Sequence, residues 1–210
     1  MRRRPPSFGL VAKRALERVG LTRTLDPLAD TVEGAVAEVV RPRPIRYVLR
    51  GTWLGHALHP LLTDFTDGPW MAASFLDLFG PKGSSPAARR LVGFGLVAAV
   101  PTLLSGLVDW EETEGAERRV GLVHAGTSSL ATLLYACSFL ARRRGNERGG
   151  VVLGLLGGTV AFWDGYLGGD LALVGRVGAG RRLPGPEARP GGANLGRRGT
   201  SSAATSHPPT

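Results

Sequence analysis

The sequence has one cysteine and two long segments without any charged residue, and each of these absences excludes certain classes of protein. The single cysteine, Cys137, excludes an intrachain disulfide framework, a Cys-x-x-Cys zinc site and an iron–sulfur cluster held by four cysteines. No Lys, Arg, Asp or Glu occurs within residues 91–108 or 120–141. A soluble helical bundle would carry charged residues along the water-facing side of such segments. The two uncharged segments therefore argue for helices surrounded by lipid.

The sequence patterns of common enzymes are also absent. There is no Gly-x-Ser-x-Gly nucleophile elbow and no Walker phosphate loop. The tripeptide Gly93-Phe94-Gly95 lies inside an apolar segment, where it cannot serve as a phosphate loop. We therefore assign no catalytic residues, and the sequence favours a protein that is not an enzyme over an enzyme.

Positive charge dominates the chain as a whole. The 210 residues contain 26 Lys and Arg against 17 Asp and Glu, which gives a net charge of +9. A protein this basic points to nucleic acid or to an anionic membrane surface. Most of the arginines lie near the two ends of the chain, and no nucleic-acid-binding module accompanies them. We expect them to flank membrane helices and expect no nucleic-acid partner.

Four segments are long and apolar enough to cross a bilayer, which takes about 20 helical residues. Aspartates interrupt the first and the fourth of them, whereas the middle two are free of charge. The predicted fold is all-α, an integral membrane four-helix transmembrane bundle in the cell membrane. With no signal peptide before it, the first span would act as an uncleaved insertion signal, and the basic leader would keep both termini in the cytoplasm. The predicted spans are residues 60–80, 91–108, 120–141 and 151–174.

Outside the spans, the chain divides into two flanks. Residues 1–50 form a basic N-terminal flank, in which 8–20 and 27–40 show apolar residues at helical spacing. We expect two amphipathic helices there, the first lying either on an anionic lipid surface or in water. Residues 51–175 would be the membrane domain, and the Gly, Pro, Ser and Arg of 176–210 predict a disordered tail.

The residues with useful chemistry converge on one membrane surface. In four antiparallel spans, the start of the first, the end of the second, the start of the third and the end of the fourth share that surface. Ionisable groups inside a membrane are costly and usually face a partner or a cavity. Neutral imidazoles from different helices can hold haem b or a divalent metal, and nearby carboxylates can complete a metal site. The predicted cofactor ligands are His56, His59 and His124, and the predicted additional metal ligands are Asp64, Asp109 and Asp170.

Other interpretations stay open at this point. The histidines can simply be hydrogen-bonded interior residues, in which case the protein would be a membrane scaffold whose basic flanks recruit a partner or anionic lipid. A proton path along Asp67, Asp64 and His59 would instead indicate a small transporter or proton-handling protein.

Four motifs follow one another along the membrane domain. They are Gly-Thr-Trp-Leu-Gly-His-Ala-Leu-His-Pro-Leu-Leu-Thr-Asp at 51–64, Ser-Gly-Leu-Val-Asp-Trp at 105–110, Val-Gly-Leu-Val-His-Ala at 120–125 and Gly-Tyr-Leu-Gly-Gly-Asp-Leu at 165–171. In this order they resemble the DUF2231 family, a four-helix membrane domain of unknown function. In many members of this family, the membrane domain looks to be fused at its C-terminus to a Rieske iron–sulfur domain. The resemblance thus implies a redox setting, with a Rieske-type or other membrane redox protein as partner and a homo-oligomer left open.

This chain departs from the family pattern in two places. The residues after Val174 lack the two Cys and two His that a Rieske centre requires. The last motif in the family usually reads Gly-Gly-His, whereas here Asp170 follows the two glycines. If the histidine of the relatives is a haem ligand, this chain lacks it, and Asp170 offers a carboxylate to a metal ion instead.

Overall fold

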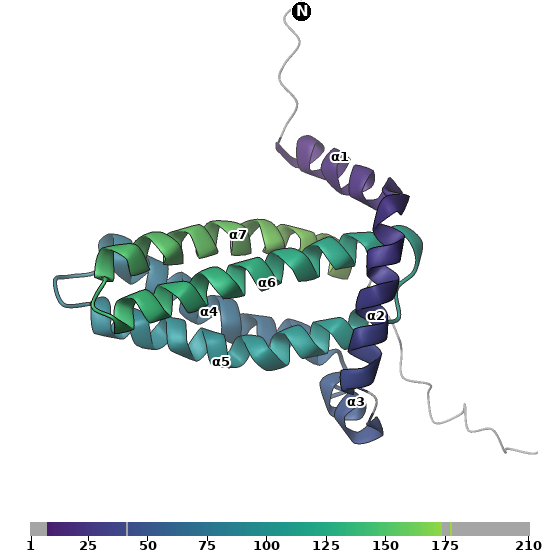
Figure 1. Cartoon of the computed structure of the whole chain (residues 1–210), viewed down its shortest axis with the longest axis horizontal. Helices are drawn as coiled ribbons and strands as arrows, with labels where there is room; N and C mark the ends of the chain where they lie inside the picture. Colours follow the sequence, from purple (N-terminus) through teal and green to yellow (C-terminus); the bar gives the residue numbers. More distant parts are fainter. Residues whose placement is uncertain (1–7, 41, 174–176, 178–210) are drawn as a thin grey trace, which may run out of the picture.

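The computed structural model describes residues 8–40, 42–173 and 177, and that part of the chain is helical without strands. The all-α prediction is therefore confirmed, while the predicted disordered tail lies almost entirely outside the described residues. Figure 1 shows the arrangement. The helices are α1 (Phe8–Leu21), the 3-10 helix η1 (Arg23–Leu25), α2 (Asp26–Val40), α3 (Arg43–Leu49), α4 (Leu58–Phe79), α5 (Ser85–Trp110), α6 (Gly115–Arg143) and α7 (Glu147–Leu173).

Helices α4 to α7 form an antiparallel bundle joined by short turns (Figure 1). Each helix packs along two neighbours: α4 on α5, α5 on α6, α6 on α7, and α7 back on α4. Helices α4 and α6 therefore occupy opposite corners of the bundle. Because both run in the same direction, their first turns lie at the same end.

Three of the four bundle helices, α5, α6 and α7, are long and apolar enough to cross a membrane. Helix α4 has 22 residues, roughly 33 Å at 1.5 Å per residue, but three aspartates and two prolines lower its hydropathy. Of the four predicted spans, three therefore coincide with helices that could cross a membrane, and the first, in α4, does not. The bundle also turns large apolar side chains outward, as expected where lipid tails surround it; examples at least half exposed are Phe65, Met71, Phe75, Phe94, Val97, Leu133, Val152 and Phe162.

An ion pair closes the interior of the bundle at the end away from α1–α3. The Arg142 Nη1 atom donates to Asp77 Oδ1 at 3.0 Å, and the Nη2 atom donates to the other carboxylate oxygen. The two side chains are 0% and 5% exposed. Since Asp77 belongs to α4 and Arg142 to α6, the pair fixes α4 inside the bundle despite its polar sequence.

Helices α1 to α3 form a layer across the opposite end of the bundle (Figure 1). The predicted helices at 8–20 and 27–40 are confirmed as α1 and α2, whereas α3 was not predicted. Ala29 on the buried face of α2 packs against Trp110, the last residue of α5, and against Leu122 near the start of α6.

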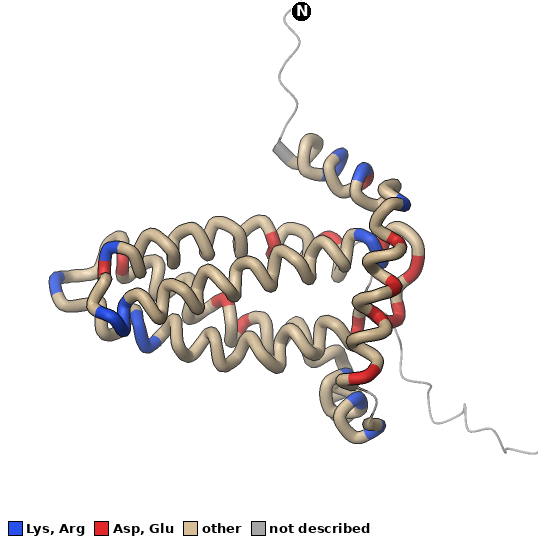
Figure 2. Tube along the Cα trace, viewed as in Figure 1, with Lys and Arg blue, Asp and Glu red and all other residues tan. Residues whose placement is uncertain are grey.

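Ion pairs fasten the N-terminal layer to the start of α6. Arg119 donates through Nε and Nη2 to the two Asp26 oxygens at 2.6 and 2.8 Å, and Arg118 lies 2.8 Å from Asp30. The hydrogen bond from Arg119 is the main reason that the pKa of Asp26 lies below its usual value. Figure 2 shows most of the acidic residues gathered at this end, together with Lys and Arg of α1, α3 and the start of α6, whereas Lys and Arg predominate at the far end of the bundle.

Candidate functional site

Two histidines face each other inside the bundle. His59 lies in the first turn of α4, and His124 lies in the third turn of α6. Their ring centroids are 6.3 Å apart, and the rings meet edge to face at 81°. Because α4 and α6 are at opposite corners, the pair spans the bundle interior.

The Nδ1 atom of each ring is turned toward a protein oxygen. His59 Nδ1 lies 2.9 Å from the backbone carbonyl of Thr102, and a carbonyl can only accept, so Nδ1 carries the proton. His124 Nδ1 lies 2.8 Å from Asp164 Oδ1, yet this nitrogen makes no well-aligned hydrogen bond within the described residues. We therefore treat that contact as electrostatic. In His59 the Nε2 lone pair is free for a ligand.

The carboxylate of Asp164 is itself held in place. The Oγ of Ser128 donates to its Oδ2 atom, and the Oγ1 of Thr127 donates to its Oδ1 atom. Both hydroxyls follow His124 within about one turn of α6, while Asp164 comes from α7. They hold a negative charge beside the His124 ring, and a carboxylate in this position raises the basicity of an imidazole as a ligand.

Two glycines provide the space that the imidazoles occupy. A Cβ atom on Gly106 of α5 would lie 2.8 Å from His59 Cε1, and one on Gly168 of α7 would lie 3.0 Å from His124 Cε1. A larger residue at Gly106 would displace the His59 ring, and one at Gly168 would require the His124 ring to give way by a few tenths of an ångström. The neighbouring Gly169, in contrast, has no atom within 4 Å of such a Cβ.

Two adjoining cavities lie on either side of the histidine pair. The first, of about 250 Å³, extends into the bundle to Thr66, Asp67 and Trp70. The second, of about 190 Å³, extends toward Asp109 and Trp110 at the end of the bundle. Both are smaller than the roughly 300–1,000 Å³ of sites for drug-sized ligands, but they share a wall. The shared residues are His59, Pro60, Leu103, His124, Ser128, Gly168 and Ala172.

Comparison with known proteins identifies the family. The model of the DUF2231 family, described as a predicted membrane protein, matches residues 55–181. The chain belongs to the DUF2231 family. No curated protein and no solved structure matches it. The DUF2231 segment contains all four bundle helices and both paired histidines, so the site described above lies within the family's domain.

The DUF2231 bundle brings together only part of the predicted site. His59 and His124 meet, whereas His56 is exposed before α4 and its Nδ1 lies 2.8 Å from the carbonyl of Ala57. Asp64 is exposed on α4, and Asp109 lines the second cavity. Among the described residues, no three His, Cys, Asp or Glu side chains are grouped so that they could hold a metal ion.

Asp170, the residue in place of the family's usual histidine, is half-buried and lines neither cavity. Sequence reasoning instead missed Asp164, which was treated only as an interruption of the fourth span. Its signal was present: a carboxylate in the middle of an apolar helix is costly unless it faces a polar partner. The partners are His124, Thr127 and Ser128, which follow one another on α6.

Proposed function

We propose that this DUF2231 protein is a one-electron carrier that holds haem b between His59 and His124. The observation behind the proposal is the meeting of two imidazoles from opposite corners of a helical bundle. Bundle proteins build cofactor sites from side chains on facing helices in this way. When bound, a haem held by these two imidazoles would supply one-electron chemistry.

Haem is favoured over a bare metal ion by the number of ligands. A tetrahedral or octahedral metal site needs three or more protein ligands, and the described residues offer no such group. A haem needs only the two imidazoles from the chain, because its other iron ligands are its own nitrogens. The two adjoining cavities would take the porphyrin on either side of the pair, and the small residues Gly168 and Ala172 line both.

The surrounding side chains have defined tasks in this proposal. The Thr102 carbonyl orients His59, and Asp164 supports the basicity of His124. Electron exchange would occur with another membrane redox protein, with a Rieske-type protein as the first candidate. The proton-path alternative is less well supported, because Asp64 is exposed on α4 while Asp67 lines the cavity.

Three single variants test the assignment. His59→Ala and His124→Ala each remove one proposed ligand, and His56→Ala removes a nearby exposed histidine as the matched control. The proteins are made in cells supplied with haem precursor and purified in detergent, and haem per chain is measured by extraction. We expect haem to be lost from the first two variants and retained in His56→Ala. Equal retention in all three, with unchanged thermal unfolding, would overturn the proposal.

A further inference from the structure

Helix α3 and the turn after it expose a set of large apolar side chains. Ile45, Val48 and Trp53 are 45%, 50% and 55% exposed. Ile45 and Val48 lie three residues apart, so they share one side of the helix. The Trp53 indole donates to the Val48 carbonyl at 3.2 Å, which folds this ring back onto the end of α3. Together the three form one apolar face, which we call the α3 face.

The rest of α3 is fixed to the bundle, so the α3 face has a definite position. Leu49 is buried against Val108 in the last turn of α5. On another side, Arg46 pairs with Glu111, and Arg50 lies 2.7 Å from Glu112. These contacts place α3 beside the end of a helix that is apolar enough to cross the membrane.

The position of the α3 face identifies what covers it. It lies beside α5, whose Phe94, Val97 and Val100 are also exposed, as expected for a helix that crosses a membrane. Its level is the end of α5, where a spanning helix meets the membrane–water interface. Tryptophan is enriched at that level, and short amphipathic segments lie there with their apolar side in the lipid. Exposed Arg43 begins the same helix and suits the headgroup region.

We propose that α3 is an in-plane membrane anchor, which inserts Ile45, Val48 and Trp53 into the boundary between lipid headgroups and acyl chains. The anchor holds the N-terminal layer against the bilayer beside the bundle. It is independent of whether a haem is bound between His59 and His124.

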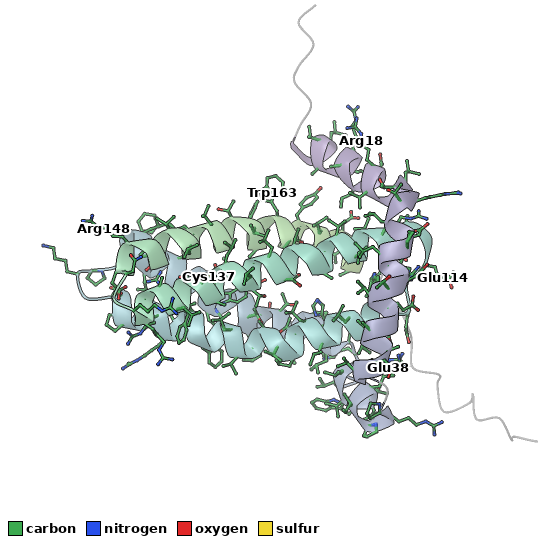
Figure 3. The ribbon with its side chains drawn as sticks, viewed as in Figure 1. Arg18, Glu38, Glu114, Cys137, Arg148 and Trp163 are labelled. Atoms are coloured by element: carbon green, nitrogen blue, oxygen red, sulfur yellow. The ribbon has the colours of Figure 1, made fainter. Side chains whose placement is uncertain are left out.

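Spin labels at single cysteines test the anchor in the full-length protein. Cys137→Ser removes the only cysteine, which is exposed on α6 (Figure 3). In that background, Ile45→Cys and Val48→Cys place a nitroxide on the α3 face. Glu114→Cys places one in the exposed turn between α5 and α6 at the same end, as the control. Each protein is reconstituted in vesicles of mixed zwitterionic and anionic lipid.

Collision with two relaxing agents reports where each label lies. We expect labels at 45 and 48 to relax with oxygen, which concentrates in lipid, and to be shielded from a water-soluble nickel chelate. The label at 114 should show the opposite pattern. Access of the chelate at both 45 and 48 would overturn the anchor. Shielding from both agents would also overturn it, because it would indicate that protein covers the face. Two positions are used so that one misfolded variant does not decide the result.

Discussion

His59 on α4 and His124 on α6 meet edge to face across the interior of the bundle, with ring centroids 6.3 Å apart. Their side chains are separated by 65 positions in sequence and come from helices that do not neighbour each other along the bundle wall. The pair therefore depends on the packing of all four helices, and changes in that packing give direct tests.

The glycine beside His124 gives the first test. Gly168→Ala adds a methyl group 3.0 Å from His124 Cε1, and the ring must move to accommodate it. We expect haem affinity to fall about tenfold or more, the size of effect seen when the groups that orient a ligand are disturbed. Gly126→Ala, on the same helix as His124, is the matched control, because its methyl group meets open space and the residue lines neither cavity. Equal haem content in the two variants would count against the position of His124 described here.

The carboxylate behind His124 gives a second test. Asp164→Asn keeps the shape of the side chain but removes the negative charge beside Nδ1. We expect haem affinity to fall about 10–100-fold, since such partners raise the basicity of the ligand. Haem titration of the purified protein measures the change. Asp170→Asn is the control, because Asp170 lines neither cavity. A loss of similar size in both variants would mean that Asp164 has no special relation to His124.

The buried ion pair at the far end predicts a change in stability without a change in the site. Asp77→Ala leaves Arg142 buried without its counter-ion, which costs about 3–5 kcal/mol in buried pairs. Arg144→Ala alters an exposed arginine two positions further along and should change stability by less than about 0.5 kcal/mol. Thermal unfolding in detergent compares the two. An Asp77→Ala protein as stable as the wild type would show that α4 does not depend on this pair.

The attachment of α2 should depend on pH. The pKa of Asp26 is lowered in the folded protein, chiefly by the hydrogen bond from Arg119. The pair therefore contributes its full stabilisation above the usual aspartate value of about 3.9 and loses it as the pH falls through the lower, folded value. Pepsin, which works in acid, should cut α2 faster as the pH drops across this range.

Asp26→Asn supplies the control for that experiment, because it cannot titrate at this position. At each pH, the variant shows how the activity of pepsin itself changes. We expect the difference in cleavage between wild type and Asp26→Asn to be largest near pH 4 and above, and to vanish in stronger acid. A constant difference at every pH would remove Asp26 as the titrating group.

The sequence predicted the bundle helices well but placed their ends less well. Apolar runs mark the part of a helix that faces lipid, so residues 91–108 and 120–141 lie within α5 and α6. The polar turns at each end of a helix do not raise the hydropathy, so the apolar segment does not include them. Helix α5 begins at Ser85, six residues before the predicted span. Helix α3 escaped prediction because it has only seven residues. The contacts that hold it, Leu49 on Val108 and Arg46 with Glu111, are distant in sequence.

The sequence predicted the level along the bundle at which the site residues lie, but not the side of each helix on which they face. Counting residues along each span placed His59 and His124 near one level, and the structure brings them together. Which way a residue faces depends on the rotation of its helix, and that is set by packing. Asp64 and Asp67 are one turn apart on α4, yet Asp67 lines the cavity and Asp64 is exposed. Asp164 on α7 was missed because its partners lie on α6, although its place in an apolar segment was a signal.

The central claim is that the two imidazoles hold one haem, and the spectrum of the wild-type protein tests it most directly. The full-length chain is purified in detergent from haem-sufficient cells, and its absorption and electron paramagnetic resonance spectra are recorded together with iron content. The account predicts one iron per chain and a low-spin ferric haem with two nitrogen axial ligands, reducible by one electron. Folded protein without haem, or with a high-spin haem that has one axial ligand, would contradict it.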